Sequence, residues 1–136
     1  MAIVVLKNRP FARWAKGEQL TDKSLCAAVR EIQNGLVDAR LGGFLFKKRI
    51  AKDHKGKSGS LRTILAYRQE DRLVFLFGFA KRERSNIDAA ERKALLELGA
   101  IYMAMSAKEL KEGVKEGKLL EVHCDDEDEK EKPDSQ

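Results

Sequence analysis

The pattern of hydrophobic and polar positions divides this chain into short β-prone runs and stripes with helical spacing. Residues Ala2–Leu6 form a β-prone run that predicts a first strand. Phe11 and Trp14 then recur at helical spacing and predict a short helix, with both aromatic side chains in the core. A second helix, capped by Thr21 or Asp22, is predicted from an apolar stripe at i, i+4, i+7 and i+11: Leu25, Val29, Ile32 and Leu36.

The middle of the chain carries the pattern of three strands. Leu41-Gly42-Gly43 predicts a turn, and Phe44–Ile50 alternates between two faces except at Lys48, where the strand is expected to end or bulge. Two apolar runs, Leu61–Arg68 and Leu73–Ala80, are separated by four turn-forming residues and predict an antiparallel hairpin. The second run is apolar on both faces, which is typical of an inner strand.

The last third of the body is predicted to be mainly helical. Asp88-x-x-Glu91 and Ser106-x-x-Glu109 have the spacing of capping boxes, and Lys118–Val122 is a candidate for a last short strand. The first of these helices carries an apolar stripe, Leu95, Leu98, Tyr102 and Met105. The order of elements predicts an α+β domain: a small antiparallel or mixed β-sheet with N-terminal helices and a C-terminal helix packed on it.

The composition fits one folded domain followed by a polar tail. The chain has 136 residues, 43% of them hydrophobic, so residues 1–124 can bury one compact core. Residues 125–136 hold no core residue and are expected to be disordered. No apolar run has the length of a membrane span or the form of a signal peptide, and Cys26 and Cys124 belong to no Cys/His cluster. We therefore expect a cytoplasmic protein with reduced cysteines, no metal and no membrane contact.

Charge is distributed unevenly along the chain. The formal net charge is +5, but residues 125–136 carry −5, which leaves +10 on residues 1–124. Residues 47–57 alone hold six Lys or Arg residues and one acid, Asp53. Basic surfaces often serve only solubility, yet a body this basic, with its cations clustered, favours a polyanionic partner. The acidic tail is either a solubilising segment or a shield for the basic surface.

The predicted hairpin gathers basic residues at one end of the sheet. The start of the first strand and the end of the second lie side by side in an antiparallel hairpin. A glycine- and lysine-rich loop precedes the first strand, and a basic run follows the second. Six cations are therefore expected at one sheet end: Lys55, Lys57, Arg62, Lys81, Arg82 and Arg84.

Common catalytic motifs are missing, so the cations themselves are the candidate chemistry. The chain has no H-E-x-x-H or G-x-S-x-G motif, and Gly56-Lys57-Ser58 lacks the upstream glycine of a phosphate-binding loop. Cleavage of RNA through its own 2′-hydroxyl needs no cofactor, only a held phosphate and stabilisation of the charge that develops on its oxygens. Arginine suits that task because its fork bonds two oxygens at once.

Residues 49–87 resemble the RelE/HigB toxins of bacterial type II toxin–antitoxin systems. The resemblance rests on the run Lys55-Gly56-Lys57-Ser58-Gly59-Ser60-Leu61-Arg62, on the hairpin, and on Ala80-Lys81-Arg82-Glu83-Arg84-Ser85. It implies the RelE-like microbial ribonuclease fold and a ribosome-dependent mRNA endonuclease that inhibits translation. By match to the family's motif, Arg62 and Arg82 contact the scissile phosphate, and Lys81 matches the lysine before the second arginine.

The resemblance leaves the proton-transfer groups open. Lys55 and Lys57 correspond to loop cations, one of which can serve in proton transfer. Some relatives carry a tyrosine where this chain has Asp88, so His54 is a further candidate for acid or base. The remaining basic residues are expected to follow the RNA backbone: Lys47, Lys48, Arg49, Lys52 and Arg84.

The implied partners are mRNA on the ribosome and a co-expressed antitoxin, expected to be a helix-turn-helix DNA-binding protein. Two other classes fit the same fold or charge. One is a ParE-like toxin that inhibits gyrase without cleaving RNA, and the other is a non-catalytic nucleic-acid-binding module. The convergence of Arg62 and Arg82 at one sheet end favours the nuclease, since neither alternative needs a phosphate-cleavage site.

Overall fold

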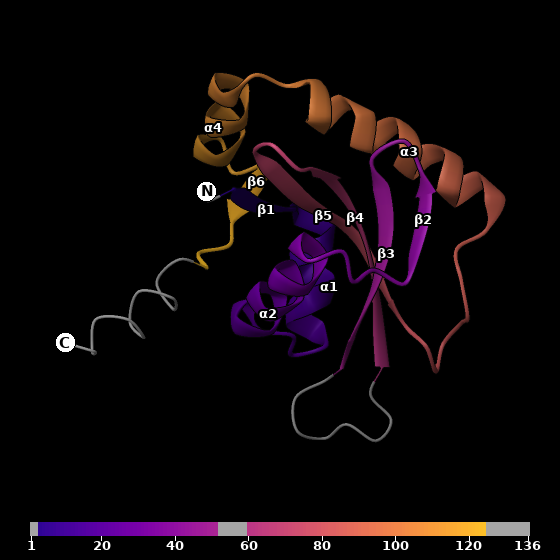
Figure 1. Ribbon diagram of the computed structural model, residues 1–136. Coiled ribbons are helices and arrows are strands. Elements are labelled where there is room, and N and C mark those ends of the chain that lie inside the picture. The colour runs from indigo at the N-terminus through magenta and orange to yellow at the C-terminus, as the bar shows by residue number, and fades with distance from the viewer. Residues whose placement is uncertain (1–2, 52–59, 125–136) are drawn as a thin grey trace.

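The computed structural model describes residues 3–51 and 60–124 as a six-stranded mixed sheet with helices on both faces (Figure 1). The strand order is β2-β3-β4-β5-β1-β6; β1 is parallel to β5, and the other neighbours are antiparallel. The strands are β1 (Val4–Asn8), β2 (Ala39–Gly42), β3 (Leu45–Ala51), β4 (Ser60–Arg68), β5 (Arg72–Ala80) and β6 (Leu119–Glu121). The helices are α1 (Arg9–Gly17), α2 (Asp22–Gln33), α3 (Ala89–Ala104) and α4 (Ala107–Lys115).

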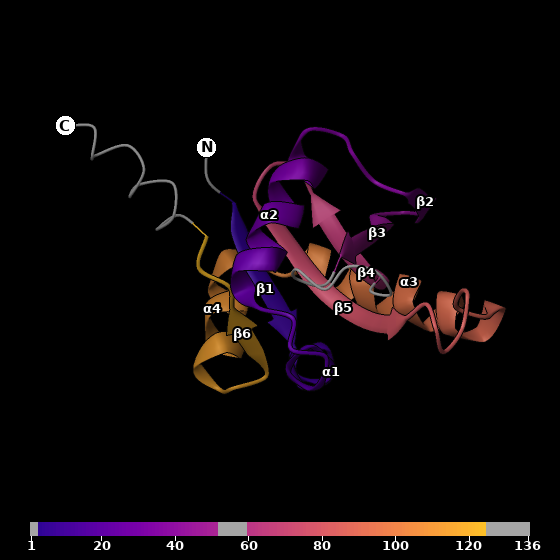
Figure 2. The same cartoon turned by 90° about the horizontal axis from the view of Figure 1, so that it is seen from below.

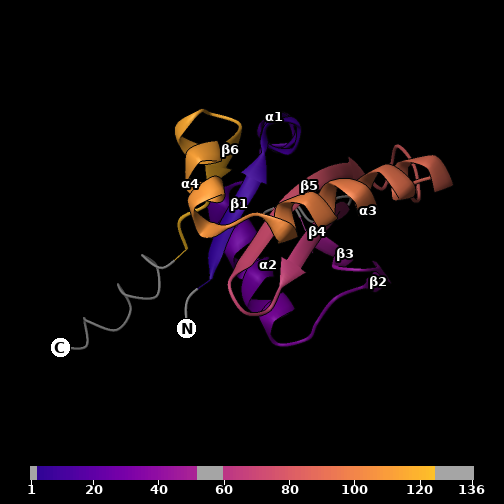
Figure 3. The same ribbon diagram turned by 90° about the horizontal axis from the view of Figure 1, so that it is seen from above.

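Each face of the sheet has its own hydrophobic core. Helices α1 and α2 cover one face, and α3 and α4 cover the other, as the views from below and above show (Figures 2 and 3). We call these the α1–α2 face and the α3–α4 face. On the first, Phe11 of α1 stacks on Phe75 of β5 at 5.1 Å between ring centroids. On the second, Gly99 of α3 lies so close to β4 that an added Cβ would meet Ala66 at 3.3 Å.

The helix starts follow from local side-chain caps, as predicted. Thr21 accepts a hydrogen bond from the amide of Ser24 and begins α2. Asp88 with Glu91 and Ser106 with Glu109 form complete capping boxes at α3 and α4. These contacts satisfy amide groups that the first helical turn leaves without a partner. The described helices include none long and apolar enough to cross a membrane.

The predicted hairpin is present, and a close contact explains a glycine within it. Strands β4 and β5 pair from Leu61 opposite Ala80 to Arg68 opposite Arg72, with a register shift at Ile64/Leu65. Gly78 lies under the Trp14 ring, and a Cβ there would be 2.2 Å from a ring carbon. Only glycine leaves room for α1 to pack this closely on β5.

Several predictions from the pattern are wrong in detail. The segment expected to be a turn at Leu41 belongs to the edge strand β2, and the chain turns at Gly43 instead. Helix α2 ends at Gln33, so Leu36 lies outside it and is 59% exposed. The stripe predicted for α3 does face the core: Leu95 is buried, and Leu98, Tyr102 and Met105 pack against the core with part of their area exposed. The pattern missed Gly99 and Met103, which are buried as well.

The two cysteines form a disulfide, which corrects the expectation that they are reduced. Cys26 lies in α2 and is 1% exposed, while Cys124 follows β6, 98 positions later in the sequence. Sequence spacing could not reveal this pair, because it depends on α2 and the segment after β6 meeting at the edge of the α1–α2 face. The bond ties the last described residue to the core.

Candidate functional site

Two arginines lie side by side on the open part of the α3–α4 face. Register pairs Arg49 of β3 with Arg62 of β4, and Arg62 in turn with Phe79 of β5. Directly opposed residues on antiparallel strands point to the same face. Ile64, two positions after Arg62, belongs to the core under α3 and α4, so this row lies on the same face. It lies beyond the part of the sheet that α3 covers at Gly99.

This arginine pair has little internal compensation. Within residues 3–51 and 60–124, neither the Arg49 nor the Arg62 guanidinium forms an ion pair; Arg62 donates to the Ser60 hydroxyl at 2.7 Å. Like charges placed directly opposite each other destabilise a sheet. An uncompensated pair of this kind is typical of a site that binds an anion, and the two forks suit the oxygens of one phosphate.

A second row extends the surface along the strands. Lys47 of β3 lies opposite Ile64, and Ile64 lies opposite Phe77 of β5. Lys47 and Phe77 are half-buried, and they border the arginine row on the same face. We call the set Lys47, Arg49, Arg62, Phe77, Phe79 and Arg84 the arginine–aromatic surface.

Arg84 closes one side of this surface. Its guanidinium carbon lies 5.4 Å from the centre of the Phe77 ring and 5.3 Å from that of Phe79. It also donates two hydrogen bonds to the carboxylate of Glu91, at 2.9 and 2.7 Å. That pairing is the main cause of the lowered pKa of Glu91, with a further contribution from the Asp88 amide.

Arg82 reaches the same end of the sheet but has different neighbours. Lys81 donates its amide to the carbonyl of Ser60, so the basic run after β5 does lie beside the start of β4. The Arg82 guanidinium lies 3.6 Å from Glu18, at the end of α1, and 3.8 Å from Glu83. It is 55% exposed. The structure thus groups Arg62 with Arg49 and Arg84, while Arg82 lies toward the helix of the opposite face.

Lys48 does not belong to the surface, which corrects its predicted role as an RNA contact. No bulge occurs there; β3 continues to Ala51, and Lys48 points into the α1–α2 face with 7% of its area exposed. Its ammonium donates to the Leu36 carbonyl at 2.9 Å and lies 2.6 Å from the Glu31 carboxylate. Lys48 therefore fastens α2 and the segment after it to the sheet.

Four predicted site residues lie outside the described part of the chain. They belong to the segment between β3 and β4: Lys52, His54, Lys55 and Lys57. The acidic tail after Cys124 lies outside it as well. Among the residues that the structure does describe, no group of three or more His, Cys, Asp or Glu side chains could hold a metal ion.

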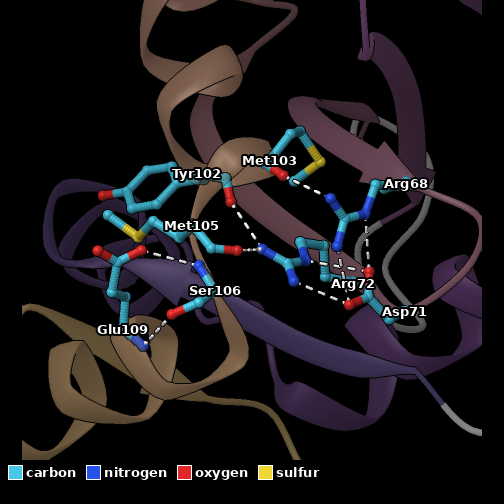
Figure 4. A network of polar contacts seen from close by, with 8 residues as sticks. All are labelled: Arg68, Asp71, Arg72, Tyr102, Met103, Met105, Ser106 and Glu109. Carbon is cyan, nitrogen blue, oxygen red and sulfur yellow. Dashed lines mark hydrogen bonds and ion pairs between the residues drawn. The ribbon is translucent and has the colours of Figure 1, made fainter.

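A second arginine cluster, at the turn end of the hairpin, was not anticipated. Arg68 and Arg72 both bond the carboxylate of Asp71 and also donate to backbone carbonyls at the end of α3 (Figure 4). The hydrogen bonds from Arg72 and then from Arg68 hold the pKa of Asp71 far below its ordinary value of 3.8. The R-x-x-D-R spacing was the available signal, but its helix partner lies 30 or more positions away.

Comparison with known proteins gives one match and one absence. The family model described as the RelE toxin of the RelE/RelB toxin–antitoxin system matches residues 3–122. The match spans nearly the whole described chain and includes every residue of the arginine–aromatic surface. No curated protein matches the sequence.

Proposed function

Since this chain belongs to the RelE toxin family and is the toxin of a toxin–antitoxin system, we propose that it is a ribosome-dependent mRNA endonuclease that inhibits translation. The observation that carries the proposal is the opposed pair Arg49 and Arg62, whose guanidinium groups form no ion pair among the described residues. A phosphate group bound between the two forks would pair with both. The family is generally associated with endoribonuclease toxins, which agrees with this chemistry.

The proposed reaction uses the RNA's own 2′-hydroxyl as nucleophile. Its oxygen attacks the adjacent phosphorus, the bond from phosphorus to the 5′-oxygen breaks, and a cyclic phosphate and a 5′-hydroxyl result. Arg62 and Arg49 hold the phosphate and stabilise the negative charge that builds on its oxygens. Arg82 joins them from the end of β5, exchanging its contact with Glu18 for the phosphate.

Proton transfer is assigned to residues near the same sheet end. The 2′-hydroxyl proton must pass to a base, and the departing 5′-oxygen must receive one. Lys81 follows β5 directly, and Lys55, Lys57 and His54 belong to the segment between β3 and β4. Lysine and histidine side chains can take up and release the proton that each of these steps transfers. No bound metal is required in this scheme.

The remaining cations of the surface are proposed to bind the RNA backbone. Lys47 lies on the same face as the arginine pair, and Lys52 continues the chain beyond β3. Such contacts are electrostatic and independent of sequence, so they position the message without selecting it. The ribosome would then present the codon to be cut.

The family match also implies a cognate antitoxin. We propose a helix-turn-helix DNA-binding protein that covers the arginine–aromatic surface or prevents docking on the ribosome. An acidic segment fits this surface best, because its carboxylates would pair with the guanidinium groups of Arg49 and Arg62. We further place the action of the toxin in the bacterial cytoplasm, where translated mRNA is found.

Controlled expression in a bacterium tests the proposed function. Induction of the wild-type chain should arrest growth, and primer extension should map new 5′ ends within translated messages. Induction of Arg62→Ala should leave both unchanged. Normal growth with intact messages would refute the nuclease, and DNA damage dependent on gyrase with intact messages would favour a ParE-like action instead.

A further inference from the structure

Arg84 differs from the other cations of the arginine–aromatic surface because its guanidinium is fixed in place. Its guanidinium carbon lies over the rings of Phe77 and Phe79, and both oxygens of the Glu91 carboxylate accept hydrogen bonds from it. Glu91 is itself held, because it accepts a third hydrogen bond from the Asp88 amide in the capping box of α3. The rings, the carboxylate and the helix start therefore orient one planar cation.

These contacts leave Arg84 poorly suited to bind a phosphate. Its charge is already balanced by Glu91, and that carboxylate would repel an incoming phosphate. The Arg84 side chain nevertheless keeps 36% of its surface exposed, while its guanidinium carbon lies over the two aromatic rings. A flat, oriented guanidinium of this kind is a surface on which nucleobases stack.

We propose that the guanidinium of Arg84, backed by Phe77 and Phe79, is a stacking seat for one nucleobase of the RNA. The inference rests on the proposed function, because it takes the phosphate to lie at Arg49 and Arg62. Phe79 is the direct cross-strand neighbour of Arg62, so the seat adjoins the phosphate position. The arrangement separates the two parts of a nucleotide: the arginine pair takes the phosphate, and Arg84 takes the face of an adjacent base.

Arg84 supplies a flat group on which a base can stack, and no residue at the start of α3 has an aromatic ring that could do so. Asp88 caps that helix and bonds the amide of Glu91, and it has no aromatic face. Stacking tolerates any base, because every base has a flat π-face. The seat would therefore hold the message in register rather than choose its sequence.

Binding to two ligands with equal numbers of phosphates tests the seat. One ligand is a 2′-O-methyl adenosine heptamer, which lacks the attacking hydroxyl and cannot be cleaved. The other is a heptamer of tetrahydrofuran spacers, which has the same phosphates and no bases. Wild-type protein should prefer the first by roughly 5- to 100-fold, the range expected for one stacked base. Fluorescence anisotropy at low salt measures both affinities.

Three variants should reduce this preference without unfolding the protein. Arg84→Lys keeps the charge and loses the plane, and Phe77→Leu keeps the apolar packing and loses the ring. In Glu91→Gln, glutamine can still complete the capping box, but the Arg84 guanidinium loses its ion pair with the carboxylate. In Glu91→Gln the affinity for both ligands should rise as the preference falls, because the charge of Arg84 is no longer balanced. A purely structural Arg84–Glu91 pair would also give the rise in affinity, because Glu91→Gln removes a negative charge, but it would leave the preference for bases unchanged.

Arg62→Gln is the matched control for phosphate binding. It should weaken both heptamers equally and lower the slope of log K against log salt by about one, as expected for one lost phosphate contact. Circular dichroism and thermal melting of every variant establish that each is folded.

The outcomes separate this inference from the proposed function. Equal binding of both heptamers by wild type, or an unchanged preference in folded Arg84→Lys, would overturn the stacking seat even if mRNA is cleaved. A base preference that depends on Arg84, in a protein that leaves cellular messages intact, would support the seat and refute the nuclease. Absence of binding to either heptamer at low salt would overturn the seat as well.

Discussion

The two ends of the β4–β5 hairpin use the same residue type for opposite purposes. At the turn end, Arg72 is 2% exposed, and its donors are matched by Asp71 and by carbonyls at the end of α3 (Figure 4). At the open end, Arg49 and Arg62 face each other with no ion pair among the described residues. The first arrangement stabilises the fold, because cations near a helix C-terminus satisfy its free carbonyls. The second leaves charge available for a ligand.

The difference shows why a count of arginines does not locate a site. Five arginines lie in or next to this hairpin within 23 positions of the sequence: Arg62, Arg68, Arg72, Arg82 and Arg84. Their roles depend on whether an acceptor lies within reach after folding. Changes at the open end of the hairpin should therefore lower activity, and changes at the turn end should lower stability.

The largest effect is expected at the open end. Arg62→Ala should lower the cleavage rate by roughly a hundred- to a thousand-fold, the usual result of losing a positioned charge at a transition state. Its free energy of unfolding should change by less than about 0.5 kcal/mol, because the side chain is partly exposed and donates one hydrogen bond, to Ser60, among the described residues. Primer extension in a translation reaction gives the rate, and urea denaturation gives the stability.

Arg40→Ala is the control for that experiment. Arg40 is also an exposed strand arginine, but it stacks on Phe46, which packs against the core of the α1–α2 face. Cleavage by Arg40→Ala should remain close to wild type. Equal losses in the two variants would mean that general positive charge, rather than the arginine–aromatic surface, supports activity.

The reverse result is expected at the turn end. Arg72→Ala should lower the free energy of unfolding by about 3 kcal/mol, because it leaves the Asp71 carboxylate with one arginine partner fewer and the Met105 carbonyl without its donor. The Tyr102 carbonyl would keep only its hydrogen bond from the Met105 amide. The midpoint of urea denaturation reports this loss. Below the transition, the folded variant should bind RNA as wild type does; a stable Arg72→Ala variant would show that the network is dispensable.

The disulfide adds a covalent support on the turn side of the molecule. Cys124 lines a cavity of about 560 Å³ together with Asp71 and Arg72, so the bond closes the chain near the turn end. Reduction should lower the free energy of unfolding by about 2–4 kcal/mol, mainly because the unfolded chain gains freedom. Thermal melting with and without a reductant measures the change. Cys26→Ser should show no further response to reductant.

The smallest effect is a dependence of stability on acid. The pKa of Asp71 is lowered in the folded protein, so its contribution to stability is fully present above the ordinary pKa near 4. That contribution should be lost progressively as the pH falls below about 4, where folding must displace protons from this carboxyl. Urea denaturation between pH 3 and pH 6 should therefore show a shallower acid dependence in Asp71→Asn than in wild type. An identical slope would mean that the carboxyl is not engaged.

Features that depend on neighbouring residues were predictable from the sequence. Both capping boxes were found from a spacing of three residues, and the β4–β5 hairpin from two apolar runs around a short turn. The position of Arg62 at the hairpin's open end follows from the same register. The basic run that begins at Lys81 also lies beside the start of β4, as the hairpin predicts. These features are set by contacts within one turn or one hairpin, so local pattern is enough.

Features that depend on distant segments were not predictable. β2 is four residues long, and its sequence has no clear alternation of apolar and polar residues. It forms a strand because its backbone pairs with the edge of β3. The inward direction of Lys48 depends on acceptors supplied by Glu31 and Leu36. The pairing of Cys26 with Cys124 required the chain to close over 98 positions.

The sequence by itself determined where this protein's cations gather, because the hairpin register brings the ends of β4 and β5 together. Only the tertiary structure decided which of them are free. Glu91 reaches Arg84 from the start of α3, Glu18 reaches Arg82 from the end of α1, and the last turn of α3 takes Arg68 and Arg72. The guanidinium groups of Arg49 and Arg62 stay without an ion pair among the described residues, and the Asp38 carboxylate bonds the backbone amide of Arg49 instead. A charge is local to its residue, but its neutralisation depends on how distant segments pack.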